Sequence, residues 1–332
     1  METINIDNKI INIEEFLSSK NLTVNHDLDL RKRKISTLPE GLTVNGSLFL
    51  GNTDIPELPA DLKVGKDLML ENSRITKLPA NLEVNGTLNL ENSKIKTLPI
   101  GLKVKGNLNL ERTKVTEIPP GTFVKEHLLL DKSRVQILPE NLTVGKDLYV
   151  KGSEVSVLPR GLNVGGDLDL KKAKRISRLP EGLRVGKCLD LEGSAINELP
   201  RDLYVGDTLW LKKSKVKSLP PGLFVGKYLD CEDLPIEEIP ADAQIKGTLY
   251  LKQTKIKSLP DNLKLKGHLS LQGTPIQKLP SGLEVGESLD LEYTQISELP
   301  ADLKIKGKLL LNGSGVKSIP DTVQIGEGVV WD

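Results

Sequence analysis

The sequence predicts a mainly β solenoid, because one pattern returns along almost the whole chain. The skeleton of residues 86–102, GTLNLENSKIKTLPIGL, comes back twenty residues away in 68–84 and in 108–124. A fixed period of this length is the signature of stacked repeats. The leucines of LNL alternate with a polar residue, as on a half-buried strand. The proline that follows cannot donate to a sheet and favours an extended chain. We therefore predict a parallel sheet of LxL strands on one side of each coil and an extended, polyproline-like return on the other.

Residues 1–21 precede the repeat and are predicted to form an N-terminal cap. The start METINID lacks the basic stretch, apolar stretch and cleavage site of a secretory signal. Asn12 with Glu15 is typical of a helix N-cap with its capping-box partner. We expect a short helix through about Lys20, with Phe16 and Leu17 on its apolar face, to cover the open edge of the first coil. A targeting or partner-binding role for this segment is the alternative.

Fifteen coils then run without a linker over residues 22–332, the last followed by a half coil from Val323. The length is typical of two domains, but the unbroken repeat predicts one elongated unit. Every step is twenty residues except the step from Leu162 to Leu183, which is twenty-one. The extra residue falls in the basic stretch Lys171–Arg175, which we expect to bulge outward as a solvated loop. Contact of this loop with phosphate or an acidic partner is the alternative.

Composition argues against several classes of partner. With 46 basic and 45 acidic residues the net charge is +1, so no global field attracts nucleic acid or a membrane. No apolar run is long enough to span a bilayer. The two cysteines are too few for a secreted disulfide scaffold. Cys188 and Cys231 are predicted on opposite faces of different coils, so we expect no disulfide. These features favour a cytoplasmic protein, with secretion into a host without a cleaved signal as an open alternative.

The repeat skeleton LxLxx(S/T)x(I/V)xxLPxxLxV resembles the leucine-rich repeats, nearest to the short Leu-Pro-rich repeats of bacterial effectors. The resemblance covers the chain from Leu22 onward. Two positions depart from the family pattern: the asparagine is replaced by a hydroxyl residue, as at Thr53 and Thr113, and the first consensus leucine by residues such as Gly65 or Asn85. We expect the hydroxyls to hold backbone groups of the turn. The Leu-x-Val-Gly arc can form a second short strand, which would bring the coil nearer to a β-helix.

This resemblance implies a protein-binding scaffold, and a bacterial or phage effector acting on a host protein. Some bacterial relatives carry a C-terminal ubiquitin-ligase domain with a catalytic cysteine, but here the repeats run to Asp332, so that activity is not carried over. His26, His127 and His268 lie in separate coils, which predicts no metal site. No phosphate loop, dinucleotide fingerprint or catalytic constellation is present. We therefore predict no enzymatic activity and no cofactor.

The aromatic residues are the predicted partner-binding residues, because most of them point away from the core. Four occupy the middle of an LxL strand and two flank one: Phe49, Tyr149, Trp210 and Tyr250, and Tyr228 and Tyr293. A coil spacing of about 4.8 Å would place Trp210, Tyr228 and Tyr250 within roughly 10 Å of one another. Exposed tryptophan and tyrosine are enriched in binding hot spots. We expect a protein partner on this sheet face; cross-strand packing that only shields the sheet is the alternative.

Charged residues form columns along the predicted solenoid. Acidic residues stack at Glu71, Glu91, Glu111 and Asp131, and basic residues stack three positions later at Arg74, Lys94, Lys114 and Arg134. We expect the two columns to neutralise each other across the turn, at little energy per pair; a charged stripe for a partner is the alternative. A nucleic-acid or polyanion binder using the outer lysines is the alternative function. It requires charges segregated by face, and the mixed columns argue against it.

The C-terminal coil is predicted to leave a strand edge unpaired. Val329 and Trp331 fall where the two strand leucines belong, and Trp331 would fill the end of the core. An open edge invites pairing with another chain. We expect a weak homodimer in which two final strands meet about a two-fold axis. A monomer capped by Trp331 with Glu327 and Gly328 is the alternative.

Overall fold

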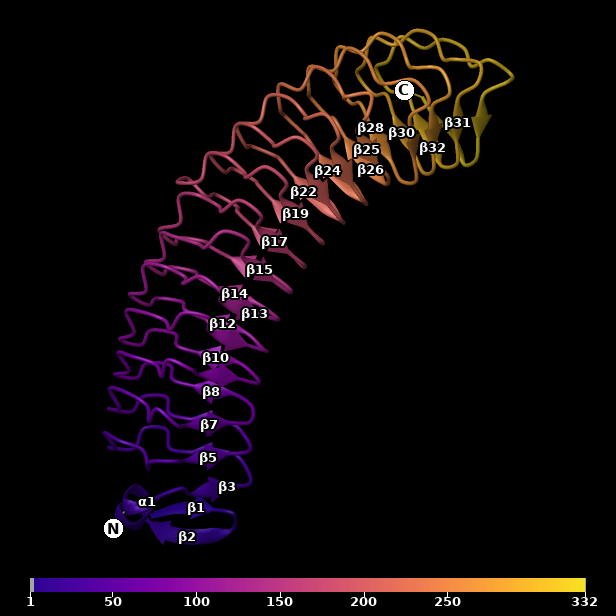
Figure 1. Cartoon of the computed structure of the whole chain (residues 1–332). Coiled ribbons are helices and arrows are strands. Elements are labelled where there is room, and N and C mark those ends of the chain that lie inside the picture. The colour runs from indigo at the N-terminus through magenta and orange to yellow at the C-terminus, as the bar shows by residue number, and fades with distance from the viewer. Residues whose placement is uncertain (1–2, 332) are drawn as a thin grey trace. The chain divides into compact units, whose positions relative to one another are not determined.

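The computed structural model describes residues 3–331. The chain divides into two compact units, Met1–Gly166 and Asp167–Asp332. Each is a stack of short-stranded coils, in which the strands of successive coils lie side by side (Figure 1). The predicted β solenoid with its 20-residue repeat is therefore confirmed. The division into a cap and a single repeat unit stays a prediction.

The N-terminal segment contains an antiparallel hairpin that sequence analysis missed. Strand β1 (Thr3–Ile6) pairs with β2 (Lys9–Asn12) in the register Ile4↔Ile11. Asp7 and Asn8 connect them with φ angles of 50° and 68°. Two consecutive positive φ values are those of a type I′ turn, the turn that two-residue hairpin loops prefer. The pair Asp-Asn between isoleucine-rich stretches was the available signal.

Helix α1 (Ile13–Ser18) follows directly, and Asn12 caps it as predicted. The Asn12 side chain accepts a hydrogen bond from the Glu14 backbone N–H at 2.9 Å. The helix ends two residues before the predicted Lys20. Both Ser18 and Ser19 donate their hydroxyls to the Glu15 carbonyl, at 3.1 and 2.9 Å, which competes with further helical bonds. Phe16, on the inner face of the helix, is fully buried.

The hairpin turn also holds the first coil. The Asp7 carboxylate accepts hydrogen bonds from the backbone N–H of Asn25 at 2.9 and 3.0 Å and from its side-chain amide at 2.8 Å. These bonds lower the pKa of Asp7, the backbone bond most. The hairpin is therefore bonded to the first coil through its turn.

Each coil of the first unit carries two short strands, which form two parallel sheets. The sheet of LxL strands, called the LxL sheet, contains β4 (Leu28–Asp29), β6 (Leu48–Phe49), β8 (Leu68–Met69), β10 (Leu88–Asn89), β12 (Leu108–Asn109), β14 (Leu128–Leu129) and β16 (Leu148–Tyr149). The predicted second strand forms the LxV sheet, with β3 (Thr23–Val24), β5 (Thr43–Val44), β7 (Lys63–Val64), β9 (Glu83–Val84), β11 (Lys103–Val104), β13 (Phe123–Val124), β15 (Thr143–Val144) and β17 (Asn163–Val164). Pairing is parallel and joins equivalent residues of successive coils, as in Leu88↔Leu108.

The second unit has the same two kinds of sheet. Its LxL strands are β18 (Leu168–Asp169), β20 (Leu189–Asp190), β22 (Thr208–Trp210), β24 (Tyr228–Asp230), β26 (Thr248–Tyr250), β28 (Leu269–Ser270), β30 (Leu289–Asp290), β32 (Lys308–Leu310) and β34 (Gly328–Val330). Its LxV strands are β19 (Arg184–Val185), β21 (Tyr204–Val205), β23 (Phe224–Val225), β25 (Gln244–Ile245), β27 (Lys264–Leu265), β29 (Glu284–Val285), β31 (Lys304–Ile305) and β33 (Gln324–Ile325). The LxV sheet ends at β25, and β27, β29, β31 and β33 form a separate four-stranded sheet.

The core of the coils is almost entirely aliphatic, and in several coils a buried hydroxyl closes the turn after the LxL strand. Leu110 and Leu211 are fully buried. The Thr113 hydroxyl donates to the Leu110 carbonyl at 2.7 Å, and Thr254 repeats this bond to Leu251 at 2.7 Å. The hydroxyl residue thus holds a backbone group of the turn, the role expected of the asparagine it replaces.

The inserted residue bulges outward as predicted. Ile176, just after the stretch Lys171–Arg175, keeps its core position with 2% exposure. Lys171 pairs with Glu192, and the Lys174 ammonium group donates to the Gly193 carbonyl at 2.6 Å. Two of the basic side chains therefore contact the next coil of the same unit, which is not the fully solvated loop expected.

The final coil agrees only in part with expectation. Strand β34 pairs with β32 in the register Leu309↔Val329, so Val329 takes the place of a strand leucine. Trp331 is 46% exposed and does not fill the end of the core. No helix in the described part of the chain has the length and apolar character that a membrane crossing needs.

Candidate partner-binding surface

The outer face of the LxL sheet in the second unit brings three of the predicted aromatic residues together. Parallel pairing aligns Asp190, Trp210, Asp230 and Tyr250 in one row, since each is the middle residue of its LxL strand. Tyr228 lies on β24 two residues before the row member Asp230, so both side chains point to the same face of the sheet. We call these five residues the Trp210 patch. A row of this kind follows directly from the repeat, because equivalent residues stack at the strand spacing of about 4.8 Å.

Trp210 is the most exposed member of the row, at 36%. Its register neighbours are two carboxylates, Asp190 on one side and Asp230 on the other. The indole face is electron-rich and the carboxylates are anionic, so all three groups favour a cation. The predicted outward position of Trp210 is therefore matched by an acidic setting that the aromatic pattern alone did not indicate.

Tyr228 and Tyr250 form the apolar side of the patch. Their ring centroids lie 5.0 Å apart at an interplanar angle of 45°, a tilted aromatic pair. Burial and, next, the hydrogen bond to Tyr250 raise the pKa of the Tyr228 hydroxyl well above its usual range. The Tyr228 phenol therefore stays neutral, and the pair shows the cross-strand packing given above as the alternative.

The two carboxylates are held by their own turns. Asp190 accepts a hydrogen bond from the Glu192 N–H at 2.8 Å, and Asp230 accepts one from the Glu232 N–H at 2.9 Å. Burial nevertheless raises the pKa of both groups above the ordinary aspartate value. Neighbouring acidic residues add to this effect, Asp169 at Asp190 and Glu232 at Asp230. The negative charge is thus costly in the isolated protein.

Nearby lysines only partly offset this charge, because they pair with other acids. Lys171 forms an ion pair with Glu192, and Lys212 forms one with Glu232. Those glutamates lie in the column next to the row, so each ion pair is neutral by itself. The aspartates of the row remain as the excess negative charge of the patch.

The predicted residues of the first unit are engaged in separate local contacts. Arg31 lies over the Phe49 ring, 5.1 Å from its centroid. The Tyr149 hydroxyl donates to Asp147 at 3.1 Å, and its ring centroid lies 6.3 Å from that of His127. Phe49 and Tyr149 therefore do not form one cluster with each other, although both lie in the outer row.

Tyr293 lies in a turn and not on the sheet face. Its φ angle is 56° and it is 60% exposed. The ring packs over Gly313 of the next coil, where an added Cβ would approach the Tyr293 ring to 2.6 Å. The ring therefore packs between two successive coils, which is a structural role. A bulky residue at positive φ is uncommon, and this packing helps to hold it there. Its predicted part in partner binding remains a prediction.

Sequence analysis missed a second aromatic cluster, on the LxV sheet of the second unit. The Tyr204 and Phe224 rings stack with centroids 4.8 Å apart and planes 6° from parallel. Arg184 lies over the Tyr204 ring at 4.6 Å. The three residues are the middle residues of successive Leu-x-Val segments, aligned by the parallel register. The signal was available, since each precedes a core valine by one residue.

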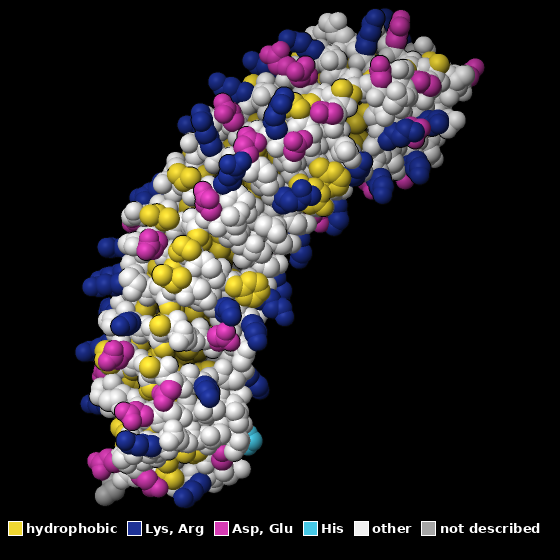
Figure 2. All heavy atoms as spheres, viewed as in Figure 1, with side chains coloured by type: hydrophobic (Ala, Val, Ile, Leu, Met, Phe, Trp, Pro, Cys, Tyr) yellow, Lys and Arg dark blue, Asp and Glu magenta, His cyan; other side chains and the backbone are white. Residues whose placement is uncertain are grey.

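The expected neutralisation of charged columns across the turn is wrong. The ion pairs join equivalent or near-equivalent positions of successive coils, as in Arg74–Asp54 at 2.8 Å, Lys103–Glu83 at 3.1 Å and Lys146–Glu126 at 2.9 Å. The acidic column keeps its repulsion: burial and then Asp131 and Glu91 raise the pKa of Glu111. Because acidic and basic residues alternate from coil to coil at such positions, positive and negative charges are mixed on the surface, as Figure 2 shows on the face in view.

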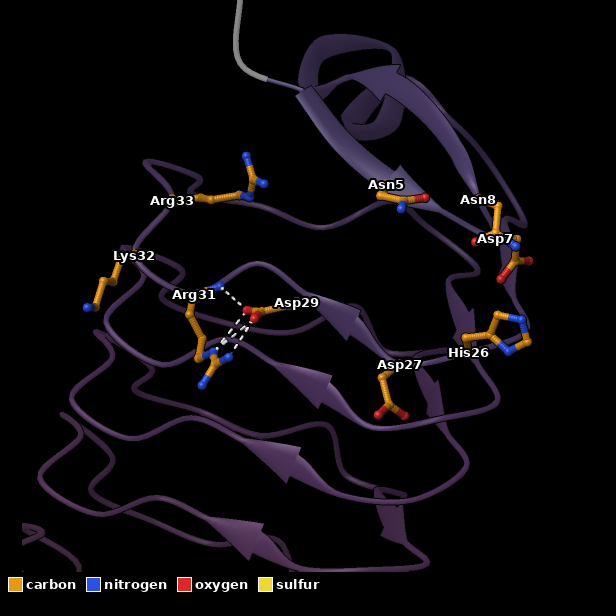
Figure 3. Close-up of a pocket in the computed structure, with 9 residues that line it drawn as sticks. All are labelled: Asn5, Asp7, Asn8, His26, Asp27, Asp29, Arg31, Lys32 and Arg33. Atoms are coloured by element: carbon orange, nitrogen blue, oxygen red, sulfur yellow. Dashed lines mark hydrogen bonds and ion pairs between the residues drawn. The ribbon is translucent and has the colours of Figure 1, made fainter.

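A polar hollow lies between the hairpin and the first coil. It is lined by Asn5, Asp7, Asn8, His26, Asp27, Asp29, Arg31, Lys32 and Arg33 (Figure 3). Its acids already have partners: Asp29 binds Arg31 through several hydrogen bonds, the shortest 2.6 Å, and Asp27 accepts from the Ser47 N–H at 2.8 Å. Among residues 3–331, no group of three His, Cys, Asp or Glu could hold a metal ion. The hydrogen bonds from Asn25 to Asp7 join the hairpin to the first coil at this hollow.

The two cysteines lie as predicted, with Cys231 buried and Cys188 half-buried, and both are free thiols. Burial raises the pKa of each thiol. Neither group has the depressed pKa of a reactive cysteine.

No protein-family model and no curated protein matches the chain. Among solved structures, it is similar to YopM from Yersinia enterocolitica, with 17% sequence identity, 92% of this chain and 91% of that chain covered, and a TM-score of 0.35. A leucine-rich repeat protein from Leptospira interrogans is 19% identical, with 89% and 84% covered and a TM-score of 0.35. YopM from Yersinia pestis, described as a leucine-rich effector protein, is 16% identical, with 90% and 88% covered and a TM-score of 0.35. The chain is thus similar to leucine-rich repeat proteins, as its repeat pattern predicts. At this TM-score the likeness carries no argument about function.

Proposed function

We propose that the chain is a non-enzymatic protein-binding scaffold whose Trp210 patch takes an arginine- or lysine-bearing segment of a partner protein. The observation that carries the proposal is the position of the Trp210 indole between Asp190 and Asp230. A cation over an indole face contributes about 0.5–2 kcal/mol, and flanking carboxylates add charge-assisted hydrogen bonds.

The electrostatics of the patch support this partner chemistry. The raised pKa values of Asp190 and Asp230 mean that their charge is poorly stabilised in the free protein. A guanidinium or ammonium group placed between them would relieve that cost on binding. The tilted pair Tyr228–Tyr250 gives a rigid apolar surface beside the charge, the combination found in hot spots.

The repeat pattern, which resembles that of bacterial effector repeats, supports a further part of the proposal: an effector acting on a host protein. A cytoplasmic site of action belongs to the same proposal. The other predicted residues, Phe49, Tyr149 and Tyr293, would extend the binding surface or serve only the local contacts described above.

Fluorescence anisotropy with a labelled arginine-rich peptide tests the proposal. Trp210→Ala should weaken binding by about 2 kcal/mol or more, since a central tryptophan anchor is lost. Asp190→Asn with Asp230→Asn should also weaken it, because asparagine keeps the turn hydrogen bond and removes the charge.

The matched control removes two exposed acids from the proline-bearing segments of the same unit, Glu181→Gln with Glu238→Gln. This control should bind as the unmodified chain does. Equal loss in both double variants would show general charge attraction and contradict a specific patch. A glutamate-rich peptide that binds equally well would contradict the assigned partner chemistry.

A further inference from the structure

A hollow in the second unit, over the four-stranded sheet of β27, β29, β31 and β33, concentrates positive charge. Five lysines and one glutamate line it together with core aliphatic residues: Lys246, Lys264, Lys266, Lys304, Lys306 and Glu284. All five lysines are exposed. The condition that the polyanion alternative required, segregation of charge by face, is thus met here even though most of the chain alternates its charges.

The lysines fall into two classes. Glu284 accepts from Lys264 at 3.1 Å and from Lys304 at 3.4 Å, so these two lysines share one carboxylate. Among the described residues, Lys246, Lys266 and Lys306 have no acidic partner. The three occupy equivalent positions, each directly after the core residue of an LxV strand.

A glycine opens the space between two of these lysines. Gly286 takes the equivalent position in the coil between Lys266 and Lys306, and an added Cβ there would lie 2.2 Å from the Lys266 carbonyl oxygen. The two ammonium groups therefore project from coils two steps apart, about 10 Å at the strand spacing, with no side chain between them. An anionic group fits this gap.

The aromatic stack lies in the coils just before the lysines, on the LxV sheet that ends at β25, whereas β27 and β31 belong to the separate four-stranded sheet. The Lys266 N–H donates to the Lys246 carbonyl at 3.0 Å and so joins the coils on either side of this break. Arg184 covers one face of the Tyr204 ring, and Phe224 covers the other. Phe224 is the last ring of this stack, and its register neighbour on the far side is the exposed Gln244. A flat ring can therefore extend the stack over Gln244, next to Lys246.

We propose that this face binds single-stranded nucleic acid, with a base stacked on Phe224 and the phosphates following Lys246, Lys266 and Lys306. Stacking rings beside a basic groove are the recurring features of such sites. An acidic peptide would use the lysines but gain nothing from the half-buried Phe224 ring, so the aromatic stack favours a nucleic acid. The site is separate from the Trp210 patch, which lies on the LxL sheet.

Fluorescence anisotropy with labelled oligo(dT) of about 12 nucleotides tests the inference over a salt series from about 50 to 200 mM. Each phosphate neutralised contributes about 0.7 to the slope of log K against log salt on a single strand. Lys266→Gln with Lys306→Gln should therefore reduce the slope by about 1.4 and weaken binding at every salt concentration in the series. Lys217→Gln with Lys255→Gln removes the same charge from the proline-bearing segments and should change little.

The stacking contact has its own variants. Phe224→Ala should weaken oligo(dT) binding by about 5- to 150-fold, the usual loss per stacked base. Phe224→Leu keeps apolar bulk and removes the aromatic face, so it should show a comparable loss without unfolding. Trp210→Ala should leave oligo(dT) binding unchanged.

Four outcomes would overturn the inference: no binding at the lowest salt, equal losses in the two lysine double variants, full affinity in Phe224→Leu, or equal binding of a blunt DNA duplex. Displacement of oligo(dT) by a glutamate-rich peptide at equal charge, together with full affinity of Phe224→Leu, would instead identify an acidic-peptide site.

Discussion

The outer rows of the LxL sheets in the two units are built on the same backbone and carry different chemistry. In the first unit, Asn89 and Asn109 accept hydrogen bonds from the Glu91 and Glu111 N–H groups at 3.0 and 2.9 Å. In the second unit, Asp190 and Asp230 accept the same bond from the backbone N–H two residues later, that of Glu192 or Glu232. The turn needs only a side-chain carbonyl oxygen, so folding does not require the carboxylate charge.

The exception in the first unit sharpens this difference. Asp29 also occupies the outer row, but Arg31 binds it through side-chain hydrogen bonds that lower its pKa. Asp190 and Asp230 have raised pKa values instead. An aspartate that serves only the local structure is therefore neutralised by its neighbour, whereas the aspartates beside Trp210 keep a costly charge. This contrast supports the proposed binding site, which rests on the position of Trp210 between Asp190 and Asp230.

The largest expected effect tests whether the cores of the two units are packed in the same way. Leu110→Ala and Leu211→Ala remove fully buried leucines from equivalent positions. Each should cost about 2–5 kcal/mol of unfolding free energy in urea titrations, because a cavity remains. A cost several-fold smaller in one unit would mean that the units differ in packing and not only at the surface.

The next effect concerns the outer rows themselves. Trp210→Ala should weaken binding of the arginine-rich peptide by about 2 kcal/mol or more, whereas Leu129→Ala, in the outer row of the first unit, should leave it unchanged. Thermal melts of both variants should stay near that of the unmodified chain, since both side chains lie on the outer face. If Leu129→Ala weakens binding as much, the contrast between the units is wrong.

A smaller effect tests the buried hydroxyls. Thr113→Val and Thr254→Val keep the side-chain shape and remove the 2.7 Å bond to a strand carbonyl. Each variant should lose about 1 kcal/mol, the usual net value of such a bond, in chemical denaturation. Unchanged stability in both would show that the hydroxyl does not replace the asparagine of the resembled family.

The smallest effect is electrostatic. Asp190→Asn with Asp230→Asn should raise the melting temperature slightly at neutral pH. The gain in unfolding free energy should stay below about 1 kcal/mol, because solvent screens both groups. Conversely, Asn89→Asp with Asn109→Asp should lower the melting temperature, since Glu111 already has a pKa raised by burial and by Asp131 and Glu91.

The pH dependence of stability tests the direction of the pKa shifts at Asp190 and Asp230. A raised aspartate pKa in the folded state means that protonation favours folding. The penalty is fully present above the raised pKa and disappears as the pH falls below the ordinary aspartate value. The gain in melting temperature of Asp190→Asn with Asp230→Asn should therefore shrink on acidification through this range. A gain that grows at low pH would contradict the assigned pKa directions.

The sequence alone determined the repeat, the strand positions and the inward and outward residues. This was possible because a solenoid places equivalent residues next to one another, so that period and alternation define the core. The leucines of every LxL strand and the outward position of Trp210 followed from that rule. The extra residue before Ile176 was located in the same way.

Only the tertiary structure decided how the outward residues meet. Side-chain direction within a column depends on neighbours one coil away, which the repeat pattern does not encode. For this reason ion pairs such as Lys103–Glu83 run from coil to coil and not across the turn. The stack of Tyr204 on Phe224 and the lysines without acidic partners at 246, 266 and 306 also appeared only there. Their chemistry arises from which exposed side chains already satisfy one another and which remain available to a partner.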